Sequence, residues 1–172
     1  MFDIHIFDNM TLEEKLKNMI IMLEGLIQDN NESDLSKLCN ACALINAIVS
    51  RNNWCGFYLL KNDKLTLGPF QGMPACTEIK IGSGVCGKAA FKKETIIVED
   101  VHKFEGHIAC DAKSNSEIVI PIVKNDKLYG VLDLDSEEFG RFTELEKLYL
   151  EKAVEIIIKY CLLYTSPSPR DA

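Results

Sequence analysis

The sequence predicts an α+β domain with a largely antiparallel central sheet and the N- and C-terminal helices packed on one face of it. Two observations predict this class. Short apolar stretches are joined in pairs by turns at Asn62-Asp63 and at Asn125-Asp126, which is typical of β-hairpins. Longer segments with apolar residues at helical spacing stand at both ends of the chain. Hairpins flanked by helices favour an α+β arrangement over an alternating parallel one.

Two helices are expected in the N-terminal third. Residues 1–10 form a lead-in without a clear pattern. Thr11 and Glu14 then have the spacing of a capping box, in which each side chain bonds a backbone N–H of the first turn. A second apolar-periodic segment follows, and either Ser33 or Asp34 can cap its start. The two segments therefore predict a pair of consecutive helices.

The middle of the chain is expected to form short strands around one short helix. Residues 54–60 are the first strand, and a turn leads to its hairpin partner at residues 65–67. Glycine and proline recur in residues 68–77, so this stretch is expected to be a loop. The elements expected next are a strand at 79–81, a helix at 85–92 and a strand at 95–98.

A polar loop and a second hairpin precede the last helix. The hairpin strands are expected at residues 118–123 and 128–135. Thr143 opens the C-terminal helix with a second capping box. The domain is expected to span residues 1–164, because residues 165–172 change abruptly to a Pro- and Ser-rich composition typical of a non-native or disordered tail.

Composition excludes several classes of partner. The net charge is −7 and no cluster of lysine and arginine reaches five residues, which argues against a nucleic-acid or anionic-membrane surface. No apolar run approaches the roughly 18 residues that span a bilayer. The N-terminus lacks a basic segment followed by an apolar one, so the cytoplasm is the expected location.

Seven cysteines are many for such a protein. An odd number without a secretory signal does not predict a structural disulfide framework. Cys39 and Cys42 form a CxxC motif, but it lies within a predicted helix and has no second metal-ligand pair. Packing of these thiols in the helix face is therefore the favoured interpretation.

Residues 82–87 satisfy the pattern GxGxxG. A dinucleotide site needs a βαβ unit around this pattern, and the hairpin-rich context does not provide one. The stretch instead predicts a tight turn into a helix, whose exposed backbone N–H groups favour an anion such as a ligand carboxylate. The same helix start is expected to favour a thiolate at Cys86.

The polar stretch from residue 102 to residue 121, which runs into the strand expected at 118–123, is the predicted active loop. It carries His102, His107 and Cys110 and leads directly into a core strand, an arrangement that lets a rigid scaffold aim loop side chains. These three residues match no standard zinc spacing and lack an obvious fourth ligand. We therefore expect no metal, and we interpret the histidines as loop organisers and Cys110 as the reactive thiol.

Acidic and aromatic side chains are expected to share one face of the sheet. Strand periodicity places Asp133 and Asp135 on the same face, and Trp54 and Tyr58 on one face of their own strand. Glu117 is a natural third acid. A solvated surface is the simplest interpretation of paired acids, but carboxylates beside an aromatic wall also suit a small amine-bearing ligand.

Several segments resemble the free methionine-(R)-sulfoxide reductases, which are single-domain GAF proteins. They cover much of residues 11–160 and include 54–58 (WCGFY), 68–72 (GPFQG), 75–77 (ACT), 84–87 (GVCG), 100–102 (DVH), 106–111 (GHIACD), 116–118 (SEI) and 130–135 (GVLDLD). Glu105 departs from the family, which usually has proline there. The resemblance implies a GAF-like fold and the reduction of free L-methionine (R)-S-oxide to methionine.

The resemblance also assigns roles. It implies that Cys110 is catalytic, that Cys76 is the resolving cysteine and that Cys86 is a further redox cysteine. The expected disulfide of Cys110 therefore forms with either Cys76 or Cys86. Thioredoxin is the implied reductant, and no metal or organic cofactor is implied. The substrate-pocket residues implied are Trp54, Tyr58, Glu117, Asp133 and Asp135.

The residue types suit that chemistry. A sulfoxide oxygen leaves only when it is protonated, and clustered carboxyl groups raise one another's pKa, so Glu117, Asp133 and Asp135 are all candidate proton donors. The alternatives are a non-enzymatic GAF sensor for a small ligand and a metal-binding module. Apolar terminal helices are also compatible with a homodimer.

Overall fold

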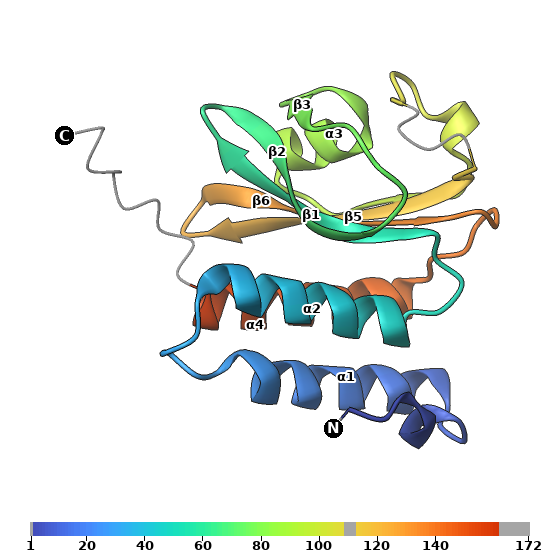
Figure 1. The fold of residues 1–172 in the computed structure, drawn as a ribbon. Coiled ribbons are helices and arrows are strands. Elements are labelled where there is room, and N and C mark those ends of the chain that lie inside the picture. The colour runs from blue at the N-terminus through green and yellow to red at the C-terminus, as the bar shows by residue number, and fades with distance from the viewer. Residues whose placement is uncertain (1, 109–112, 162–172) are drawn as a thin grey trace.

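The computed structural model describes residues 2–108 and 113–161. Its elements form layers, with three long helices on one face of a sheet and a short helix on the other (Figure 1). The helices are α1 (Leu12–Ile27), α2 (Asp34–Ile48), α3 (Gly84–Lys92) and α4 (Glu144–Tyr160), with 3₁₀ turns η1 (Ile4–Phe7) and η2 (Val101–Lys103). The strands are β1 (Trp54–Lys61), β2 (Lys64–Gly72), β3 (Glu78–Lys80), β4 (Ile96–Val98), β5 (Ser116–Lys124) and β6 (Lys127–Ser136).

The sheet is antiparallel throughout, as predicted. Its strand order is β3-β2-β1-β6-β5-β4, and every neighbouring pair runs antiparallel. Both hairpin turns have positive φ at their two central residues, 51° and 61° at Asn62 and Asp63 and 52° and 64° at Asn125 and Asp126. Asparagine and aspartate tolerate this left-handed conformation, and it matches the twist of the strands they join.

The expected loop at residues 68–72 is wrong, because these residues continue β2. Gly56 pairs with Phe70 and Tyr58 pairs with Leu67, so Gly68 and Pro69 sit at a bulge in the ladder. A bulge accepts a proline, which has no N–H to donate, without breaking the pairing on either side of it. The turn-forming residues therefore mark an irregularity in a strand and not its end.

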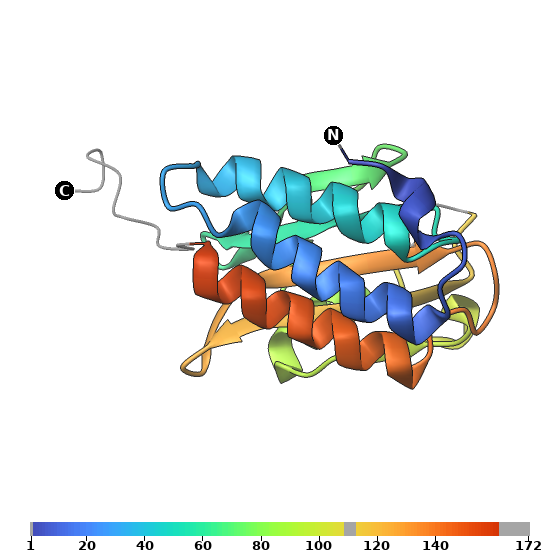
Figure 2. The ribbon, with the colours of Figure 1, turned by 90° about the horizontal axis from the view of Figure 1, so that it is seen from below.

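The terminal helices pack on one face, as predicted, in two layers. Helices α2 and α4 lie against the sheet, and α1 covers the groove between them (Figure 2). The lead-in is more ordered than expected, because it forms η1 and buries Phe7 in this helical core. Helix α3 packs on the opposite face of the sheet, where β5 and β6 contact it.

The predicted helix starts are confirmed. Thr11 and Thr143 each form a complete capping box, with Glu14 and Glu146 respectively. Ser33 caps α2 by accepting the backbone N–H of Ser36, so Asp34 is the first helical residue and not the cap. A cap satisfies N–H groups that have no partner within the helix.

Alternation along the central strands separates two apolar cores. Leu132 and Leu134 face the helical layer, whereas Val131 belongs to a second cluster beneath α3. Cys42 and Cys55 are buried in the helical core, where the Cys42 thiol donates to the Cys55 carbonyl at 3.2 Å. Packing is thus the role that the structure gives the second cysteine of the CxxC motif.

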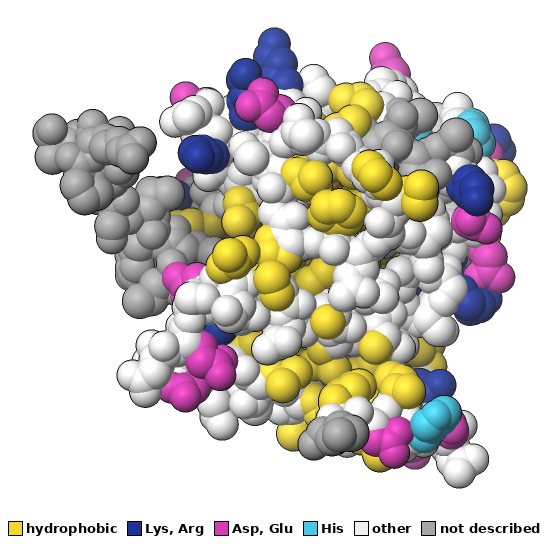
Figure 3. All heavy atoms as spheres, viewed as in Figure 1, with side chains coloured by type: hydrophobic (Ala, Val, Ile, Leu, Met, Phe, Trp, Pro, Cys, Tyr) yellow, Lys and Arg dark blue, Asp and Glu magenta, His cyan; other side chains and the backbone are white. Residues whose placement is uncertain are grey.

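Lysine and arginine side chains are scattered over the face shown in Figure 3, and they do not gather in one patch there. None of the helices among the described residues is both long and apolar enough to span a membrane. The division at residue 164 stays a prediction, because residues 162–172 lie outside the described residues.

Candidate functional site

A pocket opens on the face of the sheet that is opposite the three long helices. It and its mouth comprise about 530 Å³ of space. Strands β1, β5 and β6 form its floor, and the start of α3 and two loops form its walls. The lining residues are Trp54, Tyr58, Pro74, Ala75, Ile79, Ser83, Gly84, Val85, Cys86, His107, Ile108, Ser114, Glu117, Asp133 and Asp135. All five residues predicted to bind substrate are among them.

Strand register brings the acids together. Trp54 pairs with Asp135 across β1 and β6, and Asp135 pairs with Glu117 across β6 and β5. These three residues therefore form a row across three neighbouring strands, and Asp133 stands two residues along on the same face. Glu117 is 6% exposed and Asp133 is 5% exposed, so the simple solvated-surface interpretation is wrong for both.

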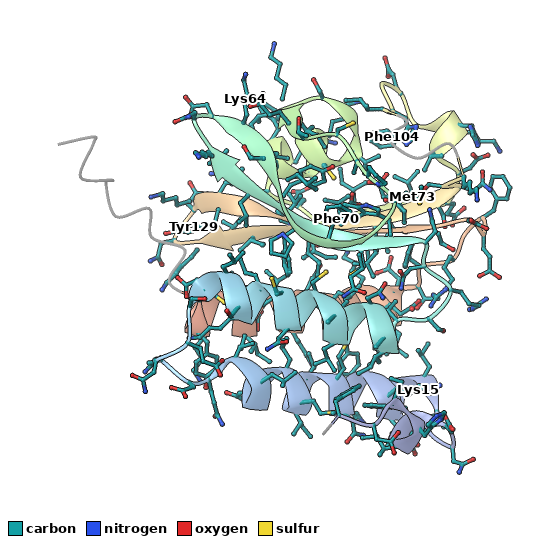
Figure 4. All side chains as sticks on the ribbon, in the orientation of Figure 1. Lys15, Lys64, Phe70, Met73, Phe104 and Tyr129 are labelled. Carbon is teal, nitrogen blue, oxygen red and sulfur yellow. The ribbon has the colours of Figure 1, made fainter. Side chains whose placement is uncertain are left out.

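Aromatic rings form the wall beside these acids. The Trp54 ring stacks on Tyr58 at 5.8 Å between centroids and on Phe70 at 5.4 Å. Phe70 belongs to β2, and Met73 directly follows the end of this strand (both are labelled in Figure 4). Gly56 permits the stack, because a Cβ atom there would lie 2.4 Å from Phe70 Cβ and 2.8 Å from the Trp54 ring.

The aromatic wall also holds the loop that carries Cys76. Trp54 Nε1 donates to the Met73 carbonyl at 3.1 Å, and the Tyr58 hydroxyl donates to the Cys76 carbonyl at 3.0 Å. Burial and the charges of nearby acids, Asp133 foremost, raise the pKa of Tyr58. The phenol thus stays protonated and remains a donor to this loop.

Cys86, Glu117 and Asp133 form the most tightly clustered group of the pocket. Their ligand atoms all lie within 4.8 Å of one another, and the Cys86 thiol is 3.8 Å from Glu117 Oε1. Among the described residues, this is the group that is compact enough to share a metal ion. Asp133 Oδ1 is buried and has no hydrogen-bond partner, so it is available to a polar ligand atom.

Burial sets the protonation of this cluster. It raises the pKa of Glu117 well above its usual range, and the Asp133 and Asp135 charges add to the effect. Burial also raises the pKa of Asp133, to about 6, while hydrogen bonds from Glu117 and Cys86 oppose the rise. A hydrogen bond between two acids requires one proton, and these directions place it on Glu117.

The expected thiolate at Cys86 is contradicted. Burial is the largest cause that raises the pKa of this thiol, and the charges of Asp133 and Glu117 raise it further. Desolvation and two nearby acids outweigh the electrostatic effect of a nine-residue helix at its N-terminus. The sequence suggested only the helix, because the acids reach Cys86 from distant strands.

The start of α3 does face the pocket. Ser83, Gly84 and Val85 line it, and the N-cap Ser83 makes no side-chain capping bond to the helix. Gly84 has φ of +63°, which glycine adopts without strain. First-turn N–H groups of a helix favour an anion, so this end of the pocket suits a carboxylate.

The redox cysteines have different environments. Cys76 is disulfide-bonded. Cys110, predicted to be catalytic, lies outside the described residues. Among the described cysteines the free thiols are Cys39, Cys42, Cys55, Cys86 and Cys161.

The histidines of the active loop have separate surroundings. His107 lines the pocket, where burial lowers its pKa. His102 Nε2 lies 3.0 Å from Asn115 Oδ1 and joins the two ends of the loop. This contact agrees with the interpretation of His102 as a loop organiser.

Several pocket residues could not be found from the sequence. Pro74, Ala75, Ile108 and Ser114 come from loops, where no periodicity indicates a direction. Ser83 and Val85 had a signal, since they flank the helix start that was interpreted as an anion site. By contrast, the alternation of side chains along the predicted strands indicated the acids and aromatic rings that line the pocket.

Comparison with known proteins identifies the family. The GAF domain model matches residues 33–157. A free methionine-R-sulfoxide reductase of Escherichia coli is 52% identical over 122 residues, which cover 71% of this chain and 74% of that protein. One of Saccharomyces cerevisiae is 43% identical over 162 residues, which cover 90% and 89%.

A solved structure agrees with these relatives. The structure of fRMsr of Staphylococcus aureus in complex with substrate is 48% identical, covers 84% of this chain and 94% of that chain, and has a TM-score of 0.79. The chain belongs to the free methionine-R-sulfoxide reductase family of GAF-domain proteins.

Proposed function

We propose that this enzyme reduces free L-methionine (R)-S-oxide to L-methionine in the pocket beneath α3. The observation that carries the proposal is the cluster of buried acids beside a stacked aromatic wall, to which Tyr58 ties the backbone of the disulfide-bonded Cys76. The names of the relatives supply the substrate and its stereochemistry. The pocket offers complementary groups for both charged ends of a small amino acid.

We assign each end of the substrate to a part of the pocket. The ammonium group contacts Asp133 and Asp135, and Asp133 Oδ1 supplies an acceptor without a competing partner. The carboxylate lies at the N-terminus of α3, where Ser83, Gly84 and Val85 line the pocket. The S-methyl group packs on Trp54. Contacts to both charged ends favour a free amino acid over a protein-bound residue.

The chemical step begins at Cys110. Its thiolate attacks the sulfoxide sulfur while the oxygen accepts protons and leaves as water. Glu117 is the assigned proton donor, because its buried carboxyl has a strongly raised pKa and lines the pocket. Water then attacks the Cys110 sulfur, which releases methionine and leaves Cys110 as a sulfenic acid.

Cys76 resolves the sulfenic acid. Its thiol condenses with Cys110, a disulfide forms and water leaves. The disulfide-bonded state of Cys76 supports this pairing, whereas the raised pKa of Cys86 disfavours it as the first attacking thiol. An external dithiol, for which we propose thioredoxin, restores both thiols by exchange. This reductant suits the cytoplasmic location expected from the sequence.

No metal or organic cofactor is needed for these steps. The group of Cys86, Glu117 and Asp133 could share an ion, but protons on the thiol and the carboxyl groups compete with a metal. Burial favours those protonated forms. We therefore assign the group to proton transfer and substrate binding.

Thiol titration tests the proposal. Reduced protein mixed with free methionine (R)-sulfoxide is expected to lose two thiols for each methionine that appears, and Cys110→Ser is expected to do neither. Wild-type protein that keeps all its thiols would overturn the proposal. The alternative, a GAF sensor, would bind the amino acid in calorimetry without consuming thiols.

A homodimer remains a further proposal. Leu12, Ile21 and Leu26 are partly or largely exposed on α1, with Ile21 69% exposed. A second copy covering these side chains would remove apolar surface from water. Light scattering on the eluting protein measures its mass and decides between monomer and dimer.

A further inference from the structure

The side chain of Asn115 joins both ends of the active loop to the end of β6. Its Oδ1 lies 3.0 Å from His102 Nε2, at the start of the loop. Its Nδ2 donates to the Glu137 carbonyl at 2.6 Å, just past β6. Both polar groups of this amide are therefore engaged, and each reaches a different segment of the chain. We name Asn115, His102 and the Glu137 carbonyl the loop clasp.

Chemistry determines the orientation of the groups in the loop clasp. The Glu137 carbonyl can only accept, so the amide nitrogen of Asn115 must face it. The amide oxygen of Asn115 then faces His102. The His102 ring must therefore carry a proton on Nε2 to donate a hydrogen bond to this oxygen. The clasp thus has a single donor and acceptor order, in which each member has one role.

The backbone reinforces the same position. Val101 N–H donates to the Asn115 carbonyl at 2.9 Å, and Asn115 N–H donates to the Ser136 carbonyl at 2.7 Å. Next to it, Asn53 Nδ2 donates to Ser114 Oγ at 3.1 Å, and Ser114 is buried in the pocket wall. The base of the loop is thereby tied to β6, the strand that carries Asp133 and Asp135.

The clasp lies outside the pocket, at the base of a loop that lines it. None of its three members lines the pocket, whereas His107, Ile108 and Ser114 of the loop do. Cys110 stands five residues before Asn115, and Glu117 stands two residues after it. A group that sets where the loop leaves the sheet therefore sets the approach of the nucleophile toward the acids, and small displacements slow such reactions strongly.

We infer that Asn115 is a positioning residue, which acts with His102 through the loop clasp to hold the nucleophile-bearing loop in register with Glu117. The inference rests on the proposed function. It concerns the rate of sulfoxide attack and not the affinity for substrate, because the clasp touches no residue assigned to either charged end of the amino acid. The backbone bonds of Asn115 persist in an alanine variant, so the fold is expected to remain.

Single-turnover kinetics test the inference. Fully reduced wild type, Asn115→Ala, His102→Ala and the double variant are mixed with increasing free methionine (R)-sulfoxide, and methionine formation is followed. Each single variant is expected to lower the saturating rate by about tenfold, the equivalent of one or two hydrogen bonds, at an unchanged half-saturating concentration. The double variant is expected to be no slower than Asn115→Ala, because both changes open the same clasp.

Two controls separate positioning from general damage. Asn46→Ala removes a side-chain bond to Gln71 at 3.3 Å on the opposite face of the sheet and should leave the rate unchanged. His102→Gln keeps an N–H donor near the position of Nε2 and should recover most of the rate. Saturating rates equal to wild type in Asn115→Ala, a change in the half-saturating concentration alone, or additive losses in the double variant would each overturn the inference.

Failure of the proposed function gives a different result. If wild-type protein forms no methionine under these conditions, the reductase assignment fails, and the variants are not needed to show it. An active wild type with an equally active Asn115→Ala overturns only the role of the loop clasp.

Discussion

Glu117 shows how burial converts an ordinary acid into a proton donor. Its carboxyl group stands in a row with Trp54 and Asp135, and little water reaches it. The unfavourable desolvation of a carboxylate and the charge of Asp133 both hold its proton in place. A residue that would be ionised on the surface therefore stays available to the sulfoxide oxygen.

Glu117→Gln is expected to slow methionine formation by about a hundredfold, because the amide keeps the shape but supplies no acidic proton. The wild-type rate should fall as pH rises through the raised pKa of Glu117, since only the protonated form donates. The rate of the Glu117→Gln variant should not show this decrease as pH rises. Single-turnover rates measured across pH 5 to 9 check both effects, and an identical pH profile in the two proteins would remove Glu117 from this role.

Gly56→Ala is expected to lower the free energy of unfolding by about 1–3 kcal/mol, because its Cβ would overlap the stacked rings of Phe70 and Trp54. Gly25→Ala is the matched control, since nothing lies within 4 Å of a Cβ atom there. Gly25 lies in the last turn of α1, where alanine should stabilise by up to roughly 0.5–1 kcal/mol. Urea unfolding of both variants measures the difference, and equal effects would argue against the steric explanation.

At the scale of elements, β1 does more than form a wall. Its two rings hold the backbone of residues 73–76 through the Met73 and Cys76 carbonyls. One strand thereby shapes the substrate pocket and fastens the segment that carries the proposed resolving cysteine. The bulge in β2 has a related effect, because it lets this strand continue to Gly72 and delivers the loop to the pocket mouth.

Tyr58→Phe is expected to slow disulfide formation severalfold while methionine release in the first turnover changes less. The lost hydroxyl leaves the Cys76 carbonyl without its 3.0 Å donor, so the loop is held less closely, whereas the ring still packs on Trp54. Quenched-flow thiol counting separates the two steps. Tyr129→Phe, on β6 outside the pocket lining, serves as control, and a larger effect on methionine release than on thiol loss would contradict the assignment.

At the scale of the whole molecule, the site carries a cost in stability. Two acids are buried on a sheet that also serves as the hydrophobic core, and one carboxylate oxygen of Asp133 has no partner. An uncompensated polar atom costs free energy, which a substrate ammonium can recover on binding. The buried ion pair between Arg141 and Glu146, at 2.7 Å, belongs to the helical layer on the other face and does not add to this cost.

Asp133 makes stability depend on pH in a predictable direction. Its folded-state pKa of about 6 lies above the ordinary aspartate value. Between these two pH values the folded state therefore binds more protons than the unfolded state. Stability from this group is present below pH 4 and is lost as pH rises to about 6. Asp133→Asn should therefore remove a decline in the free energy of unfolding of roughly 2 kcal/mol between pH 4.5 and pH 7.5. Urea unfolding at pH 4.5 and pH 7.5 checks it, and parallel declines in both proteins would exclude Asp133 as the source.

Much of the fold follows from local rules that operate along the chain. Alternation placed Asp133 and Asp135 opposite Leu132 and Leu134, and the capping boxes located two helix starts. The prediction failed at residues 68–72, because a bulge and a turn use the same residue types. It also failed for Cys86, because its electrostatics depend on strands more than thirty positions away in the sequence.

The sequence by itself determined the strands, the helices and the faces on which the acids and aromatic rings lie, since these depend on periodicity and turn chemistry within a few residues. The tertiary structure alone decided which acid keeps its proton, which thiol stays neutral and how Asn115 ties the active loop to β6. Those properties depend on burial and on distances between segments that meet only when the sheet has formed. Local pattern therefore places the chemical groups, and packing sets their pKa values and their partners.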